Sequence, residues 1–367
     1  MRQNIYSRAH RLSHPRPLGG LPDGFSQRFF LIIPTRLRIL TCVCSIAVLL
    51  AAFLLLPAGA SAHTLATRME RDSGPRFSVS PGFDTRYRDG NWIPVDVSLS
   101  NSNADFNGTL SIGIVPPYGN PGNSSTASNY QVPVNLANGA RKQITVYIPL
   151  STGASGTTQN ITVNLLNGNG QVVSKQTSTL NALGTGDVFV GVLSDQTTGF
   201  APLNAVQLPN QGGSMIVEQL SASTMPSLAA VLKNFDIIVL DNFTTSSLSA
   251  DQLNALNTWV NQGGSLIEVG GPEWHRTLAP LPASLLPVTI TGTSSVSAGT
   301  SLLPVGGPDR SGVNQQGSVP ASVNAAVPVS TATLATGTKA LTLLSSGTTP
   351  LIVQAQQGEG TVSYLAF

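Results

Sequence analysis

The chain has 367 residues, of which 10% are charged, and its formal net charge is +2 at pH 7. The charge is unevenly distributed: residues 1–62 hold seven arginines and one acid (+6), which leaves twelve basic and sixteen acidic residues (−4) for residues 63–367. A segment of this charge lacks the basic surface that binds phosphate backbones, so we expect no nucleic-acid partner. Its length is sufficient for two ordinary domains.

The N-terminal segment predicts export. Arg36 and Arg38 immediately precede an apolar run over residues 39–56, which is just long enough to cross a bilayer. Ala60-Ser61-Ala62 then forms an Ala-x-Ala site, so a retained membrane anchor and a signal peptide cleaved after Ala62 both stay open. In either case the arginines keep residues 1–38 in the cytoplasm. We therefore expect the membrane as a partner through residues 39–56, with extracytoplasmic domains at the cell membrane, or secretion after cleavage.

Both cysteines of the chain, Cys42 and Cys44, lie within this apolar run. The exported part therefore has no disulfide, no thiol nucleophile and no thiolate metal site. Residues 63–77, which are charged and show no hydrophobic periodicity, are predicted to be a linker.

Short strands dominate the next stretch, residues 78–183. Residues 91–100 alternate apolar and polar side chains, which is typical of a half-buried strand. Asn167-Gly168-Asn169-Gly170 lies between two strand patterns and predicts a hairpin, because Asn and Gly accept positive φ. Further strand patterns cover residues 109–115, 131–136, 143–149, 161–166 and 171–179. About seven strands of this kind predict an immunoglobulin-like or fibronectin-like β-sandwich.

Residues 184–367 are predicted to form an α/β domain. Residues 236–240 have the continuous apolar pattern of a buried strand, and residues 266–269 have the same pattern. Between them Ser249 and Gln252 have the spacing of a capping box, and Gly263-Gly264 is a helix stop. This arrangement predicts a right-handed βαβ unit. Residues 291–338 are predicted to be short strands and loops.

The predicted organisation is a basic N-region (1–38), a signal peptide or anchor (39–62), a linker (63–77), a β-sandwich (78–183) and an α/β domain (184–367). The chain stops at Phe367 within a predicted strand, so we expect the last domain to be truncated.

Four segments resemble the class I glutamine amidotransferase-like superfamily: VGVLSD, NFDIIVLDN, LNALNTWVNQGGSLIEVGG and GEGTVSYLAF. The resemblance implies a flavodoxin-like α/β domain, and the layout is similar to bacterial membrane-anchored proteins in which a β-sandwich precedes such a domain. Glutaminases of the superfamily carry a Cys in a Gly-x-Cys-x-Gly elbow and a downstream His-x-Glu pair. This chain has no cysteine after Cys44 and no His-x-Glu. Since the reaction needs a thiolate, we reject glutaminase activity and expect a degenerate domain.

Ligands of open α/β sheets bind beyond the carboxyl ends of the strands. The residues at those predicted ends include Asp195, Asp241, Asn242, Glu273 and His275. Carboxylates with a histidine are suited to a hard metal ion or to acid–base catalysis. Strand-end acids also commonly cap loops, one histidine is too few for an imidazole-rich zinc site, and His275 is expected to pack with its neighbouring tryptophan. Asp195, Asp241, Glu273 and His275 are therefore the catalytic candidates, with no metal or cofactor assigned.

Three functions are consistent with these features. The leading hypothesis is a non-catalytic, membrane-associated extracytoplasmic scaffold or binding protein with a degenerate amidotransferase-like domain. The first alternative is a hydrolase-like enzyme that uses the four candidate residues. The second is an envelope- or carbohydrate-binding module, for which Trp92, Tyr118 and Tyr130 offer aromatic surfaces for stacking. The expected partner is an envelope protein or a glycan.

Overall fold

The computed structural model describes residues 74–115, 129–151, 157–196, 198–206, 208, 212–300, 302–304 and 323–367. All of them belong to one compact unit, Asp72–Phe367. The predicted N-region, membrane segment and signal peptide lie outside the described residues, as does Tyr118.

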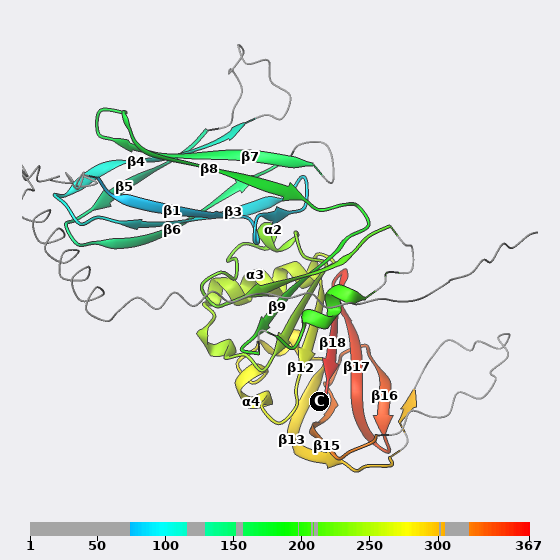
Figure 1. The fold of residues 1–367 in the computed structure, drawn as a ribbon. Helices are drawn as coiled ribbons and strands as arrows, with labels where there is room; N and C mark the ends of the chain where they lie inside the picture. The colour runs from blue at the N-terminus through cyan, green and yellow to red at the C-terminus, as the bar shows by residue number, and fades with distance from the viewer. Residues whose placement is uncertain are drawn as a thin grey trace, which may run out of the picture. The chain divides into compact units, whose positions relative to one another are not determined.

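The N-terminal part of the described structure is a sandwich of two antiparallel sheets (Figure 1). The smaller sheet has the order β1-β3-β6, with β1 at Arg76–Pro81, β3 at Trp92–Ser100 and β6 at Arg141–Pro149. The larger sheet has the order β2-β8-β7-β4-β5, with β2 at Arg86–Tyr87, β8 at Val172–Ala182, β7 at Thr158–Asn167, β4 at Phe106–Val115 and β5 at Asn129–Leu136. Only β2 runs parallel to its neighbour in this sheet.

Alternation of apolar and polar residues decides which face of each sandwich strand is buried. In β3 the side chains of Ile93, Val95, Val97 and Leu99 are at most 2% exposed, whereas Ser98 between them is exposed. A strand directs successive side chains to opposite faces, so the even-numbered residues of β3 form the outward face. The apolar side chains of both sheets pack into one core.

The C-terminal part of the described structure contains an eight-stranded mixed sheet of order β10-β9-β11-β12-β18-β17-β16-β14. Its strands are β9 (Val188–Ser194), β10 (Met215–Leu220), β11 (Ile237–Asp241), β12 (Ser265–Val269), β14 (Leu303–Pro304), β16 (Ala340–Ser346), β17 (Thr349–Gln357) and β18 (Gly360–Leu365). The five strands from β10 to β18 are parallel, and β17, β16 and β14 continue the sheet antiparallel. A separate two-stranded antiparallel sheet pairs β13 (Val288–Val296) with β15 (Val327–Leu334).

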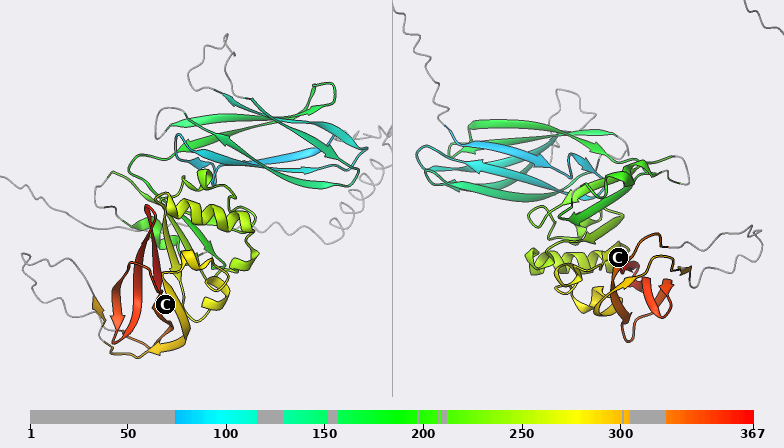
Figure 2. Two further views of the ribbon diagram at one scale, coloured as in Figure 1. Left: turned by 180° about the vertical axis from the view of Figure 1, so that it is seen from behind. Right: turned by 60° about the horizontal axis from the view of Figure 1, so that its bottom comes forward.

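The described helices are few and short. The α-helices are α2 (Ala229–Leu232), α3 (Ala250–Asn261) and α4 (Trp274–Thr277), and the 3-10 turns are η1 (Ala201–Ala205), η2 (Thr245–Ser247) and η3 (Ala283–Leu285). Figure 2 shows the longest, α3, lying along the mixed sheet, and α3 buries Leu256, Trp259 and Val260.

The local signals around α3 are present as predicted. The Ser249 hydroxyl accepts a hydrogen bond from the Gln252 amide at 3.2 Å, and the Gln252 side chain accepts one from the Ser249 amide at 2.8 Å. Gly263 ends the helix at φ +111°, a conformation that costs side-chain-bearing residues free energy. Because β11 and β12 flank α3 and pair in parallel, these segments form the predicted βαβ unit.

The prediction of a flavodoxin-like α/β domain is wrong. The structure is 51% strand and 12% helix, and two of the three described α-helices have only four residues. The physical reason lies after α4, where Thr- and Ser-rich segments form the two-stranded β13–β15 sheet and the antiparallel strands β16 and β17. A flavodoxin-like fold needs helices there to cover both sheet faces, so the resemblance to class I amidotransferases fails with it.

The prediction of a transmembrane helix has no counterpart in the structure. Within the described ranges, no helix is long and apolar enough to span a bilayer. The segment on which that prediction rested, residues 39–56, lies outside those ranges.

Residues of the sandwich contribute to the core of the mixed sheet. Phe83 packs edge-on against Phe189 and Phe235, with ring centroids 6.1 and 4.5 Å away. The fully buried Asn234 donates hydrogen bonds to the carbonyls of Trp92 at 2.7 Å and Val231 at 2.8 Å. These contacts bind the loop after β1 and the start of β3 to the mixed sheet.

Candidate functional site

Two predicted site residues lie together at the carboxyl ends of the neighbouring strands β9 and β11. We call this part of the mixed sheet the carboxyl edge. Asp241 ends β11 opposite Ser194 of β9, and Asp195 follows directly. The Ser194 hydroxyl donates a hydrogen bond to the Asp241 carboxylate at 3.1 Å, so this acid already has a partner. Asn242 follows β11 with φ +42°, a left-handed conformation that Asn tolerates better than most residues.

Arg276 of α4 organises this edge, although it was not among the site residues predicted from the sequence. Its guanidinium forms an ion pair with Asp195. It also donates to the Asn242 side-chain oxygen at 2.9 Å and to the Thr244 hydroxyl at 2.7 Å. The sequence offered one signal for Arg276, since this cation directly follows His275 just beyond the end of the next strand. Its partner Asp195 lies 81 positions earlier in the chain (276 − 195), and the local sequence does not show that pairing.

The other two predicted catalytic residues have different surroundings. Glu273 is the exposed residue that precedes the first turn of α4. His275 stacks on Trp274, with ring centroids 3.5 Å apart and an interplanar angle of 29°. Across the described ranges, no group of three or more His, Cys, Asp or Glu side chains has a metal-binding arrangement. The edge is thus a network in which Asp195 forms an ion pair with an arginine and Asp241 accepts a hydrogen bond from a hydroxyl, an arrangement suited to holding loop ends.

Glu268 of β12 is the most unusual titratable residue of the mixed sheet. It is completely buried, and neither carboxyl oxygen has a hydrogen-bond partner among the described residues. Burial raises its pKa well above the ordinary value, which favours the neutral acid. Beside it on β18, the Tyr364 hydroxyl lies 2.6 Å from the Ser330 hydroxyl. The Glu268 carboxyl group is therefore enclosed in the core of the described structure.

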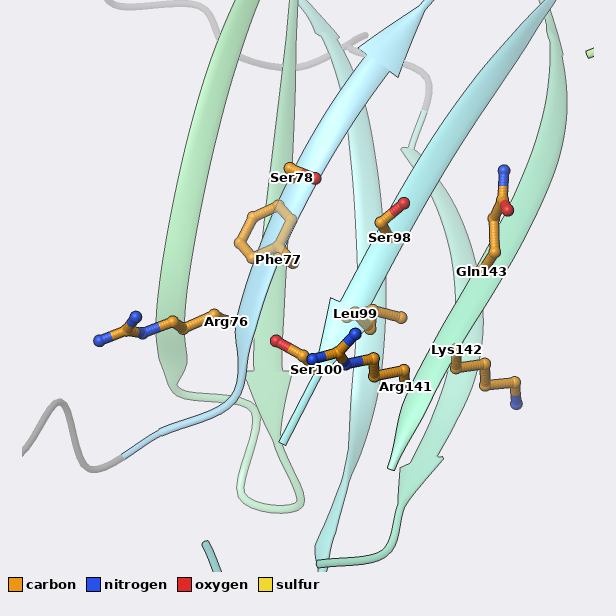
Figure 3. Close-up of a pocket in the computed structure, with 9 residues that line it drawn as sticks. All are labelled: Arg76, Phe77, Ser78, Ser98, Leu99, Ser100, Arg141, Lys142 and Gln143. Atoms are coloured by element: carbon orange, nitrogen blue, oxygen red, sulfur yellow. The ribbon is translucent and has the colours of Figure 1, made fainter. Parts of the chain in front are cut away.

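The sandwich presents a groove with a volume of about 540 Å³ (Figure 3). It lies at one end of the β1-β3-β6 sheet, where Arg76, Ser100 and Arg141 are in register, and Ser78, Ser98 and Gln143 form the next row. Phe77 and Leu99 of the same strands pack toward the core, so the residues of both rows face outward. The sequence predicts these strands, but their shared outward face is seen only in the structure.

The charge of this outward face changes along the strands. Two cations, Arg76 and Arg141, stand in the outward row at this end, whereas Lys142 pairs with Leu99 on the other face of the sheet. Among the described residues that line the groove there is no acid. The next row along the sheet contains Asp96, which accepts a hydrogen bond from the Thr145 hydroxyl. Burial raises the pKa of Asp96, and the Thr145 hydrogen bond opposes that effect. Positive charge is therefore concentrated at the open end of the face.

The aromatic residues proposed for stacking lie elsewhere. Trp92 is 41% exposed at the opposite end of β3, and Tyr130 of β5 packs against the sandwich core. The Tyr147 hydroxyl accepts a hydrogen bond from the Ser227 amide at 3.2 Å, so the segment before α2 contacts the face at its far end. The groove is thus a polar and cationic surface rather than an aromatic platform.

Residues 74–181, the sandwich strands, match a family described as a domain of unknown function, DUF8726. No curated protein matches the chain. Among solved structures, a cytoplasmic protein of Salmonella typhimurium, STM3548, is 16% identical with a TM-score of 0.35 and covers 56% of this chain and 84% of its own. Another from Salmonella typhimurium LT2, STM1381, is 17% identical with a TM-score of 0.33, over 57% of this chain and 85% of its own. Likenesses at these TM-scores carry no inference about fold or function.

Proposed function

We propose that this chain is a non-catalytic, exported binding protein that recognises a glycan of the cell envelope through the outward face of β1, β3 and β6. The observation that supports the proposal is the groove of about 540 Å³ on that face. Its Ser78–Ser98–Gln143 row offers hydroxyl and amide groups side by side, which match the alternating donors and acceptors of sugar hydroxyls. Export rests on the basic and apolar N-terminal sequence.

The edge at β9 and β11 has a structural role in this proposal. In this proposal the carboxylates of Asp195 and Asp241 serve as partners of Arg276 and Ser194. General acid–base catalysis needs a group that can reach the substrate proton. The Arg276 network instead joins the ends of β9 and β11 to α4.

A screen of the purified full chain on an array of envelope polysaccharides tests the proposal. Ser98→Trp places a bulky side chain in the middle of the groove, and Thr177→Trp places the same side chain at an exposed position of β8 on the other sheet. We expect binding that Ser98→Trp abolishes and Thr177→Trp leaves intact, with both variants retaining the parent melting temperature. Binding that survives Ser98→Trp, or an array without signal, would contradict the proposal.

A further inference from the structure

A tight turn of the sandwich lies against the edge strand β10 of the mixed sheet, and three charged side chains meet at this contact. Asp84 and Arg86 belong to the turn, and Glu218 belongs to β10. We infer that these three residues form a pH-sensitive clasp, which is closed at acidic pH and opens locally when Glu218 loses its proton. Opening releases the turn from β10 while the rest of the sandwich stays attached. The clasp is separate from the glycan groove and does not depend on the proposed function.

The turn has a backbone conformation that residues other than glycine rarely adopt. Phe83 and Arg86 exchange two backbone hydrogen bonds, of 3.0 and 2.8 Å, across Asp84 and Thr85. Both central residues have positive φ, +46° and +64°, as a type I′ turn requires. This conformation is costly for a β-branched residue such as Thr, so it persists only where the surroundings hold it in place. The turn therefore opens more readily than an unstrained one when a contact around it is weakened.

The contacts that hold the turn come from both parts of the described structure. Phe83 is 3% exposed and packs against Phe189 and Phe235 in the core of the mixed sheet. On the sandwich side, the Asn181 amide of β8 donates a hydrogen bond to the Thr85 carbonyl at 2.8 Å. The turn thus joins the sandwich to the mixed sheet, and the charged groups lie at this junction.

One guanidinium group faces two carboxylates in the clasp. The Arg86 Nη1 atom lies 3.2 Å from the Asp84 carboxylate and 3.9 Å from the Glu218 carboxylate. The Glu218 side chain is only 15% exposed, and Ile216 and Leu220 on the same face of β10 pack with the core of the mixed sheet. The elements beside β10, namely β9 and η1, contain no charged residue. An ionised Glu218 therefore leaves the clasp with one more negative charge than positive charge.

Burial decides the direction of the pH dependence. Desolvation raises the pKa of Glu218 from 4.5 to about 7, the Asp84 carboxylate adds to the increase, and Arg86 opposes it. When the turn opens, water reaches the carboxyl group and its pKa falls back toward 4.5. The closed form holds the proton more tightly than the open form, so closure is favoured below pH 4.5 and weakens as pH rises toward about 7. From about pH 5.5 to about pH 8.5 these pKa values allow at most about a 30-fold change in the closing equilibrium, and solvent screening leaves about tenfold.

Hydrogen exchange of the purified full chain tests the clasp, with each amide's rate divided by its intrinsic rate at the same pH. We expect the protection of the Phe83 and Arg86 amides to fall about tenfold between about pH 5.5 and about pH 8.5. Glu218→Gln cannot ionise, so it should keep the protection of the acidic state at both pH values. Glu359→Gln removes an exposed acid between β17 and β18 and should show the same fall as the parent.

A further variant and two control amides complete the test. Asp84→Asn removes the neighbouring negative charge, so the protection of its turn should fall less than that of the parent. The Gly90 and Leu150 amides, which form hydrogen bonds within the sandwich, should keep their protection throughout. Constant protection of the turn in the parent, or an equal fall in Glu218→Gln, would overturn the inference. An equal fall at Gly90 and Leu150 would show global unfolding rather than a local clasp, and would overturn it as well.

Discussion

Glu218 gives the structure a pH-dependent stability that one substitution can isolate. It lies on the edge strand β10 with its side chain 15% exposed. Desolvation raises its pKa from 4.5 to about 7, the Asp84 carboxylate adds to the increase, and Arg86 at 3.9 Å opposes it. Because the folded state holds this proton more tightly than the unfolded chain, the stabilisation is complete below pH 4.5 and is lost as pH rises toward about 7.

The size of this effect follows from the pKa difference. The interval from 4.5 to about 7 corresponds to at most about 3.4 kcal/mol at about 1.36 kcal/mol per pH unit. Solvent at this edge strand screens part of the electrostatic effect, so we expect Glu218 ionisation to cost about 2 kcal/mol of stability. Glu218→Gln cannot ionise, so its free energy of unfolding relative to the parent should rise by that amount between pH 4.5 and pH 7.5. Urea denaturation of both proteins across this range measures it. A difference that stays constant with pH would refute the reasoning.

Three further substitutions test the packing of the described structure by urea denaturation at pH 7. Glu268→Met removes a buried carboxyl group that lacks hydrogen bonds, so we expect stabilisation by about 1–3 kcal/mol, and destabilisation would contradict its described surroundings. Asn234→Ala leaves the Trp92 carbonyl and the Arg88 amide without their buried partner and should cost about 2–4 kcal/mol, whereas a cost below 1 kcal/mol would argue against these bonds. Ser249→Ala should cost about 1 kcal/mol, with Ser249→Asn as the control that retains a capping side chain.

The parts of the fold that local sequence predicts are those with strong local causes. Ser249 and Gln252 meet across one helical turn, and the apolar alternation of β3 is complete within nine residues. Both signals depend on residues a few positions apart, so they can be recognised without knowledge of the rest of the chain.

The incorrect fold class came from segments without such signals. Residues 340–346 of β16 are mostly half-buried and mix apolar with polar side chains, because the strand lies near one edge of the sheet. Their strand structure depends on pairing with β17 and β14, which the local pattern does not encode. The helical signal of α3, by contrast, was strong enough to suggest an alternation of strands and helices that the chain does not continue.

The candidate sites also combine features that local sequence predicts with features that it does not. Asp195 and Asp241 could be placed at one sheet edge from strand ends alone, but their pairing with Arg276 and Ser194 required the tertiary structure. The outward rows of the groove join three strands that are distant in sequence, and only the strand register reveals them.

The most direct test of the binding face uses single cysteines on the two sheets of the sandwich. Ser98→Cys places a thiol in the middle of the groove, and Thr177→Cys places one at an exposed position of β8 on the other sheet. Alkylation of each full-chain variant with and without an envelope polysaccharide that binds the chain, followed by peptide mass spectrometry, measures how far the polysaccharide protects each thiol. We predict that the polysaccharide protects the thiol at position 98 and leaves the thiol at position 177 unchanged. Equal protection of both thiols, or protection at position 177 alone, would show that the groove on β1, β3 and β6 is not the binding face.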